Sequence, residues 1–344
     1  MYGASSSRRT TASGAGKNRQ KMKFNEVVDA VNRVVVARSS CTLRSADLCA
    51  SCGTAGVYLA EPPLRRPSMP NLGPAVRFSS LGGSAHLKSL GTSGWSGVTG
   101  VAIDPMPRRK LIHFIRHAEG FHNIDPEVMK MQAGLDARLT DEGKSQCATL
   151  AKSIEQLRPQ LIVTSPLART VQTAALALAL QIRRDATKMV ALEHVRETVN
   201  YLCDARRPLS AIVGELDSMG MQLDVSACEH EHDELWASYE RKHGSQQAFM
   251  AHRESADLPA LAMRARRAFG WLAARPEQEI VVVTHSAFLW NVLNMERVGK
   301  RSGVEPICDY GGDFELEGWL SAKFENCEMR TVVAEFPEHV RAPG

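Results

Sequence analysis

The sequence predicts an α/β domain, a three-layer α/β/α sandwich with a mainly parallel central sheet, preceded by a largely disordered N-terminal region. Two observations predict it. Short apolar runs typical of buried strands recur along the chain, at residues 111–115, 161–163, 189–192, 280–283 and 329–336. Several of the segments between them space apolar residues three and four positions apart, as amphipathic helices do. Strands that alternate with helices favour a layered domain with parallel strands.

The helix starts and ends are the next signals along the chain. Thr140 is a good N-cap, and Asp141 and Glu142 suit the first turn of a helix that Pro159 would end. After the second strand, Ser165 is expected to cap the next helix, with Pro166 at its first position. Further helices are expected at residues 260–274 and 287–295, and the clearest strand of the chain lies between them.

Composition limits the classes of function. Of the 344 residues, 44% are apolar and 23% are charged, which is ordinary for a globular protein with a core. Residues 1–108 hold 14 lysines and arginines against 5 acidic residues, whereas the remainder holds 28 against 33. The net negative charge of that remainder argues against nucleic-acid binding. No apolar run approaches the about 18 residues of a transmembrane helix, so no membrane contact is expected.

Residues 1–108 have the composition of a basic leader. Residues 1–23 contain no acidic residue and are rich in Ser, Thr, Gly, Arg and Lys, a composition that predicts disorder. Residues 24–38 have apolar residues at helical spacing. A basic leader with an amphipathic helix matches an organelle transit peptide, and a disordered tail or a mistaken gene start are the alternatives. We expect an intracellular protein, in a plastid or mitochondrion if the leader targets it and otherwise cytoplasmic.

No metal site or cofactor is expected. Cys49 and Cys52 form a CxxC motif with no second pair at zinc spacing, which indicates free thiols in a reducing compartment. Residues 229–234, EHEHDE, have the side chains of metal ligands, but alternating charges of this kind usually form a solvated loop or a helix start.

Polar side chains gather where the strands end. Arg116 and His117 follow the first strand, residues 165–169 the second, Glu197 the third, and His285 the strand at 280–283. The carboxyl ends of parallel strands lie on one edge of a sheet, so these side chains are expected to meet there. Each has an ordinary alternative: Arg169 can be a solvated helix residue, His285 a core histidine and Glu197 a surface carboxylate.

Such a set of residues suits phosphate chemistry. Guanidinium groups match phosphate oxygens, and the N–H groups of helix starts add further donors. A neutral imidazole can attack phosphorus and carry the phosphoryl group, while a second imidazole stabilises the growing charge. A carboxylic acid can protonate the departing oxygen. Arginine and histidine supply the positive charge, so this chemistry requires no metal.

The chain resembles the histidine phosphatase superfamily, also called phosphoglycerate-mutase-like. The resemblance covers roughly residues 109–336, leaving residues 337–344 as a C-terminal tail. Its motifs stand in family order: IRHAEGFHN, LTDEGKSQ, VTSPLARTVQTA, VRETVNYLCDARR and VVVTHSAFL. One position departs from the family pattern, since Ala118 stands where Gly usually follows the Arg-His pair, and this puts the shape of the loop in doubt.

The resemblance implies roles for the residues at these motifs. His117 would be the phosphorylated nucleophile, and Arg116, Arg169 and His285 would hold the phosphoryl oxygens. Glu197 would be the proton donor, with Glu193 as the alternative. Three further residues are implied as substrate contacts: Asn123 near the phosphate, and Arg206 and Arg207 at a second acidic group of the substrate. For these last two, solvated loop arginines are the alternative.

The most favoured function is a metal-independent phosphatase that hydrolyses a phosphorylated small molecule through a phosphohistidine. A phosphoglycerate-mutase-type phosphotransferase is the nearest alternative, but family mutases carry a longer match around the acid than VRETVNYL does. A catalytically idle phosphate-binding protein of the same fold is the third hypothesis, although all four core residues are present. Substrate choice is expected to lie in residues 198–260, where Trp236, Tyr239 and Phe249 line a pocket or, more favourably, pack in the core. The sequence indicates neither the substrate nor the oligomeric state.

Overall fold

A computed structural model of the chain describes residues 76–78, 108–244, 253–299 and 303–336. All of these residues belong to one compact unit, Leu59–Gly344. The helix expected at residues 24–38, the Cys49–Cys52 pair, Phe249 and the tail at residues 337–344 lie outside the described residues.

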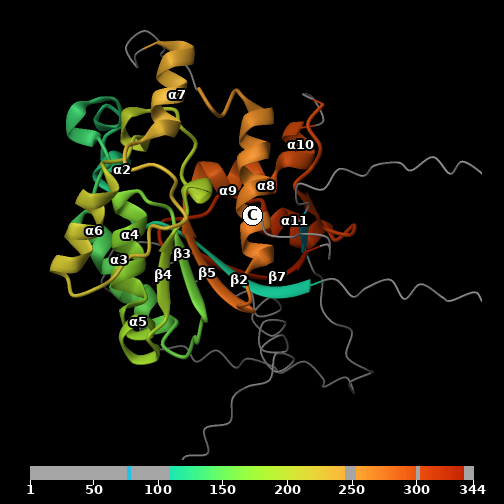
Figure 1. The fold of residues 1–344 in the computed structure, drawn as a ribbon. Helices are drawn as coiled ribbons and strands as arrows, with labels where there is room; N and C mark the ends of the chain where they lie inside the picture. The colour runs from blue at the N-terminus through green and yellow to red at the C-terminus, as the bar shows by residue number, and fades with distance from the viewer. Residues whose placement is uncertain (1–75, 79–107, 245–252, 300–302, 337–344) are drawn as a thin grey trace, which may run out of the picture. The chain divides into compact units, whose positions relative to one another are not determined.

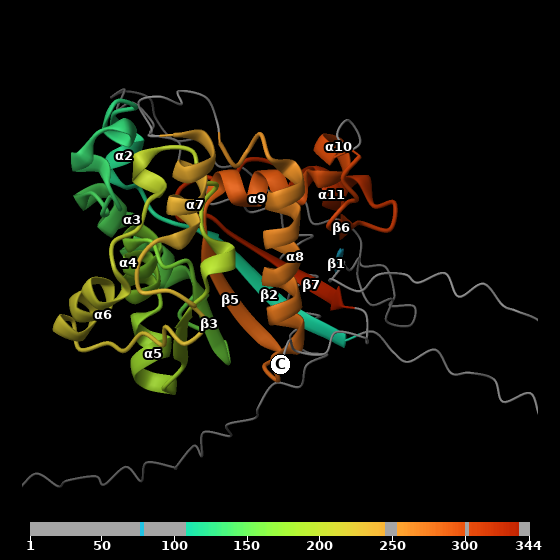
Figure 2. The same cartoon turned by 45° about the horizontal axis from the view of Figure 1, so that its top comes forward.

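The centre of the fold is a seven-stranded sheet in the order β4-β3-β5-β2-β7-β1-β6 (Figures 1 and 2). Its strands are β1 (Val76–Phe78), β2 (Arg108–Arg116), β3 (Leu161–Thr164), β4 (Lys188–Ala191), β5 (Glu279–Thr284), β6 (Cys308–Asp309) and β7 (Met329–Phe336). β4, β3, β5 and β2 run parallel to one another, β7 pairs antiparallel with β2 and parallel with β1, and β6 closes the edge antiparallel. The predicted mainly parallel sheet is confirmed.

Helices cover both faces of this sheet, as the three-layer prediction requires (Figures 1 and 2). One face packs against α3 (Asp141–Ser153), α4 (Ala168–Ala177), α5 (Ala179–Asp185) and α6 (Leu209–Ser218). The other packs against α8 (Leu258–Ala274), α9 (Ser286–Leu293), α10 (Met295–Gly299) and α11 (Phe314–Leu320). Alternate residues of β5 serve the two cores: Val281 and Val283 lie in the first and Ile280 and Val282 in the second. Every residue of the strand's centre is therefore apolar.

The strand register sets the level of the site. Arg116 of β2 lies beside Thr284 of β5, and Thr164 of β3 lies beside Val283. The three strands therefore end together, and the residue after each one emerges at the same edge of the sheet. α2 (Phe121–Ile124) follows directly after β2 on this edge.

The insert expected to choose the substrate has a small core of its own. It contains α6 and α7 (Glu234–His243), and the short 3-10 turns Glu193–Val195 and Leu202–Asp204 lead into it. Trp236 and Tyr239 are buried in a cluster with Val199 and Ala205, so core packing is the confirmed interpretation for both aromatic rings. No helix within the described ranges is long and apolar enough to cross a membrane.

Residues 76–78 are an exception to the leader predicted for residues 1–108. They form β1, and its buried Phe78 stacks on Phe269 of α8 with ring centroids 4.1 Å apart. Three residues carry too little periodicity to predict a strand, and this one gains its stability from β7, which follows more than two hundred positions later in the chain.

The two helix-start predictions have different outcomes. Thr140 caps α3 as expected, because its hydroxyl oxygen accepts a hydrogen bond from Gly143 N at 2.9 Å. The cap expected at Ser165 is wrong: α4 begins only at Ala168, whose N–H donates to Asp136 Oδ1 at 2.7 Å. The helix expected at residues 287–295 is two helices, α9 and α10, and α3 ends before reaching Pro159.

Candidate active site

The carboxyl edge of the sheet brings the predicted residues together. His117 N donates to Thr284 O at 2.9 Å, and Ser165 N donates to Val283 O at 3.0 Å, so both backbones are fixed to the end of β5. His285 comes directly after β5, at the start of α9. The residues at the centre are fully enclosed, with Arg169 and His285 0% exposed and His117 1% exposed.

The His117 ring presents one nitrogen for chemistry. Its Nδ1 lies 2.7 Å from the Ala118 carbonyl oxygen, which can only accept a hydrogen bond. Nδ1 must therefore carry the proton, and the lone pair lies on Nε2. The pKa of His117 falls well below its ordinary value because of burial first and the charge of Arg169 second. Both effects favour the neutral imidazole.

His285 and His122 flank this ring. The His285 centroid lies 5.1 Å from that of His117, and its Nε2 lies 2.8 Å from Ser165 Oγ. The His122 centroid, on α2, lies 5.3 Å from that of His117. Burial and then the nearby arginines lower the pKa of His285 well below its ordinary value and that of His122 to about 2. The site is thus lined by three neutral rings.

The two arginines supply the positive charge. Arg116 Nη1 donates to Phe324 O at 2.9 Å, and burial lowers the pKa of this guanidinium. Arg169 donates from Nη1 to Cys203 O at 2.7 Å and pairs with Asp204 Oδ1 at 3.2 Å. Within the described residues, the Nε of neither arginine has a hydrogen-bond partner. Buried cations with incomplete partners favour the binding of an anion with several oxygens.

Glu197 is suited to hold a proton. Its carboxyl group lies at the start of α9, where it accepts from Phe288 N at 2.7 Å and Ala287 N at 3.2 Å, in addition to Thr198 N at 2.9 Å. These donors and Arg169 stabilise the ionised form, but burial and then the charge of Asp204 outweigh them and raise the pKa of Glu197.

Glu193, the alternative acid, has other partners. Its carboxylate pairs with Arg196 Nη1 at 2.6 Å and with Arg206 Nε at 3.1 Å. Two guanidinium groups thus occupy its oxygens. The contacts therefore favour Glu197 over Glu193 as the proton donor.

The three further residues expected to contact the substrate are placed differently from one another. The exposed Asn123 stays near the site: its Oδ1 accepts from Gly120 N at 3.0 Å, and it lies 3.4 Å from Asn326 Nδ2, which also donates to His117 O. Arg206 is buried, and its guanidinium is engaged by Glu193 and by the carbonyl groups of residues 230–232. Arg207 binds Asp136 at 2.9 Å and Glu215 at 2.8 Å. Arg206 is thus enclosed by its partners, whereas the half-buried Arg207 links Asp136 to Glu215.

Residues 229–234 form a loop and a helix start, as predicted. Asp233 caps α7 by accepting from Trp236 N at 2.9 Å, and Glu234 is the first helical residue. The described part of the chain holds no cluster of three or more side chains that could bind a metal ion.

Sequence reasoning missed His122 and Asp204 as parts of the site, and it gave Ser165 the role of a helix cap in place of a partner of His285. His122 lies within the first motif, five residues after His117, and Asp204 lies within the CDARR segment. Their positions in the sequence do not reveal that they turn inward, since that depends on the packing of α2 and of the turn at Leu202–Asp204.

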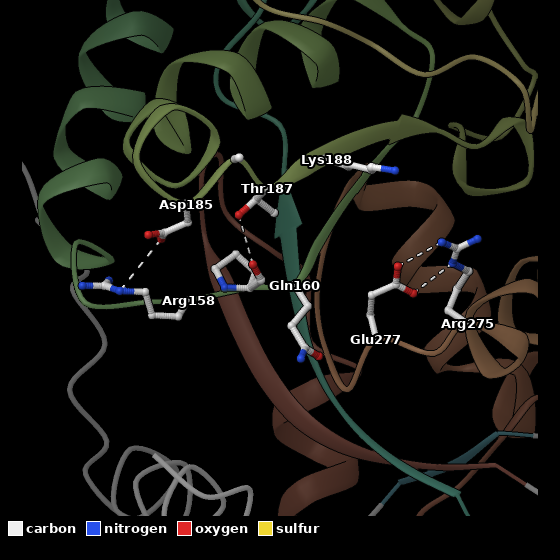
Figure 3. A pocket seen from close by; sticks show the side chains of 9 residues that line it. Arg158, Gln160, Asp185, Thr187, Lys188, Arg275 and Glu277 are labelled. Atoms are coloured by element: carbon white, nitrogen blue, oxygen red, sulfur yellow. Dashed lines mark hydrogen bonds and ion pairs between the residues drawn. The ribbon is translucent and has the colours of Figure 1, made fainter. Parts of the chain in front are cut away.

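A surface hollow lies at the opposite edge of the sheet. It is lined by residues just before β3, at the start of β4 and after α8, among them Gln160, Lys188 and Glu277 (Figure 3). Arg275 pairs with Glu277 there at 2.9 Å, and Arg158 lies 3.9 Å from Asp185. None of the described residues that line it is a histidine or a cysteine, and it lies at the other end of the strands from His117, so we do not assign the chemistry to it.

Comparison with known proteins agrees with the motifs. Residues 112–199 match the model of the histidine phosphatase superfamily (branch 1), a range that includes His117, Arg169 and Glu197. The chain is 28% identical over 267 residues to phosphoglycerate mutase-like protein 1 of Arabidopsis thaliana, covering 68% of this chain and 84% of the relative. It is 27% identical over 289 residues to phosphoglycerate mutase-like protein 2 of the same plant, covering 67% and 75%. The resemblance to this superfamily is confirmed.

A solved structure, phosphoglycerate mutase from Bacillus anthracis str. Sterne, aligns with 14% identity and a TM-score of 0.37, covering 66% of this chain and 88% of that one. Those values are too low for a functional comparison.

Proposed function

From the match to the histidine phosphatase superfamily, we propose that this protein hydrolyses a phosphomonoester of a small molecule through a phosphohistidine on His117. One observation carries the proposal: the His117 Nδ1–H bonds to the Ala118 carbonyl, which leaves the lone pair on Nε2, in a buried ring that is flanked by His285 and feels the charge of Arg169 and Arg116. A neutral, oriented imidazole next to fixed positive charge is what attack on a phosphoryl group needs.

In the first step, the Nε2 lone pair of His117 attacks phosphorus and forms an N–P bond. The ester P–O bond breaks, its electron pair leaves on the alcohol oxygen, and the carboxyl proton of Glu197 passes to that oxygen. Arg116, Arg169 and His285 stabilise the phosphoryl oxygens as charge develops.

In the second step, water attacks the phosphoryl group and gives a proton to the Glu197 carboxylate. The N–P bond breaks, and its electron pair returns to Nε2. Phosphate leaves, and Glu197 is again protonated for the next cycle. Two buried guanidinium groups supply the charge that these steps require, so we propose that hydrolysis is independent of metal ions.

Hydrolysis of p-nitrophenyl phosphate by the purified protein, with EDTA present, tests the proposal. We expect turnover in the wild type, its loss in His117→Ala, and wild-type turnover in the control His232→Ala, which removes an exposed imidazole. Acid-labile labelling by a phosphorylated substrate should likewise disappear only in His117→Ala. Full activity of His117→Ala would overturn the nucleophile assignment.

A wild type that does not hydrolyse phosphate esters would direct attention to the two other hypotheses. Phosphate transfer between phosphoglycerates would then identify a mutase. Binding of inorganic phosphate with neither activity would identify an idle phosphate-binding protein.

For the leader, we propose organelle targeting. The support is compositional, because residues 1–75 are basic and hold few acidic residues. Fusion of residues 1–75 to a fluorescent protein should direct it to a plastid or mitochondrion, and a cytosolic signal would contradict the proposal.

A further inference from the structure

The backbone that carries Glu197 is held by one side chain from another helix. Arg264 of α8 is buried, and its Nη1 donates to His194 O at 3.0 Å and to Arg196 O at 2.8 Å. Its Nη2 lies 3.4 Å from Glu197 O. A single guanidinium group therefore fixes the carbonyl groups just before Glu197 and that of Glu197 itself.

Glu254 completes the clamp on the other side. It forms a two-pronged ion pair with Arg264, Nε to Oε1 at 2.7 Å and Nη2 to Oε2 at 2.8 Å. Oε2 also accepts from Val199 N at 2.8 Å, and Glu254 N donates to Val199 O at 3.2 Å. Arg264 and Glu254 together thus bind the backbone at residues 194, 196 and 199, on both sides of Glu197.

The same guanidinium also touches the group that holds the Glu197 carboxyl. Arg264 Cζ lies 4.9 Å from the centroid of the Phe288 ring, and Phe288 N donates to Glu197 Oε1 at 2.7 Å. Arg264 therefore contacts the backbone of Glu197 and also Phe288, at the helix start that orients the Glu197 side chain.

We propose that Arg264, held by Glu254, is a positioning residue that sets the place of the Glu197 carboxyl relative to the departing oxygen. The inference rests on the proposed function. Proton transfer depends steeply on geometry, so a misplaced acid should harm substrates that need the proton and spare those that do not.

Two variants and one control test this role. Arg264→Lys keeps the charge but loses the two-pronged geometry. The double variant Arg264→Met/Glu254→Met removes both charges, so that no unpaired charge stays buried if the single variant fails to fold. Arg266→Gln is the control, since Arg266 lies on the same helix but donates to Glu305 O, at 2.8 Å, away from Glu197.

The measurement is kcat with β-glycerophosphate, an alkyl ester that needs the proton, and with p-nitrophenyl phosphate, which needs it little. We expect the ratio of kcat for β-glycerophosphate to kcat for p-nitrophenyl phosphate to fall about tenfold or more in the Arg264 variants. The same ratio should stay unchanged in Arg266→Gln. In a Glu197→Gln background, Arg264→Lys should lower the ratio no further. Equal loss with both substrates, or a further loss in that background, would show a merely structural role.

A second readout does not depend on turnover. The pKa of the Glu197 carboxyl, followed by carbon-13 NMR of labelled glutamate and assigned with Glu197→Gln, should shift in Arg264→Lys and not in Arg266→Gln. An unchanged pKa would overturn the positioning role. If the wild type hydrolyses neither ester, the proposed function fails, while the NMR titration still decides whether Arg264 positions Glu197.

Discussion

His117 and Glu197 owe their states to opposite effects of the same burial. Removal from water disfavours the charged form of each group, so it lowers the pKa of the imidazole and raises that of the carboxyl. His117 is thereby kept unprotonated, and Glu197 is helped to remain protonated. These are the two states that phosphoryl transfer needs at its first step.

Replacement of the proposed acid should show a dependence on the leaving group. Glu197→Gln cannot donate the proton, so we expect phosphoenzyme formation to slow by about a hundredfold or more for alkyl phosphates and much less for p-nitrophenyl phosphate. Single-turnover kinetics measure this step. The matched Glu193→Gln should instead lower stability, because it leaves Arg196 and Arg206 short of a carboxylate. The leaving-group pattern in Glu193→Gln would reverse the assignment.

His122 makes stability depend on pH. Its folded pKa is about 2, against about 6.5 in an unfolded chain, so below pH 6.5 only the unfolded state gains the proton. The contribution of His122 to the free energy of unfolding therefore falls by about 1.4 kcal/mol as pH falls from 7.5 to 5.5. Urea unfolding at the two pH values should show a smaller difference in His122→Phe than in the wild type. His232 is exposed and serves as the control. If His232→Phe reduced the pH-dependent difference in stability as much as His122→Phe does, His122 would not be its cause.

At the scale of elements, what could be predicted from the sequence follows from how local each signal is. The apolar runs of β2, β3 and β5 are local, and they are enough to place Arg116, His117 and His285 at strand ends. The role of Ser165 depends on His285, 120 positions away, so local capping rules gave the wrong partner. The roles of Arg206 and Arg207 likewise depend on distant carboxylates and carbonyls.

α3 approaches the loop after His117 so closely that its first turn requires glycine. A Cβ on Gly143 would lie 2.1 Å from the carbonyl oxygen of Glu119, which also accepts from Thr140 N at 3.0 Å. Gly143→Ala should therefore push α3 away from the loop at residues 118–120, lowering both the midpoint of thermal unfolding and kcat.

Gly214→Ala is the control for this effect. Gly214 lies inside α6, where a Cβ meets no atom within 4 Å, so alanine should stabilise that helix by roughly 0.5–1 kcal/mol. A Gly143→Ala protein as stable and active as the wild type would show that the loop can move without cost.

At the scale of the whole molecule, one strand of the sheet precedes all of the motifs. Residues of β1 join the sheet between β7 and β6, and Phe78 packs on Phe269 and on Phe336, at centroid distances of 4.1 and 5.7 Å. This aromatic cluster links the first described strand to the last one and to α8. The same helix carries Arg264, so the stability of this region also bears on the proposed acid.

Two truncations separate the leader from the domain. Removal of residues 1–75 keeps β1, so the protein should unfold at the wild-type temperature and retain its kcat. Removal of residues 1–107 deletes Phe78 and exposes Phe269 and Phe336, and we expect a marked fall in the midpoint of thermal unfolding.

Phe78→Ala in the full chain isolates this packing from the loss of other residues. It should cost about 3–5 kcal/mol in the free energy of unfolding, the range for a buried phenylalanine. If Phe78→Ala and the longer truncation were both as stable as the wild type, β1 would be dispensable and the domain would begin at β2, as the motifs alone suggest. A loss in both would place the start of the domain at β1, because the aromatic contact reaches from there to the far end of the chain.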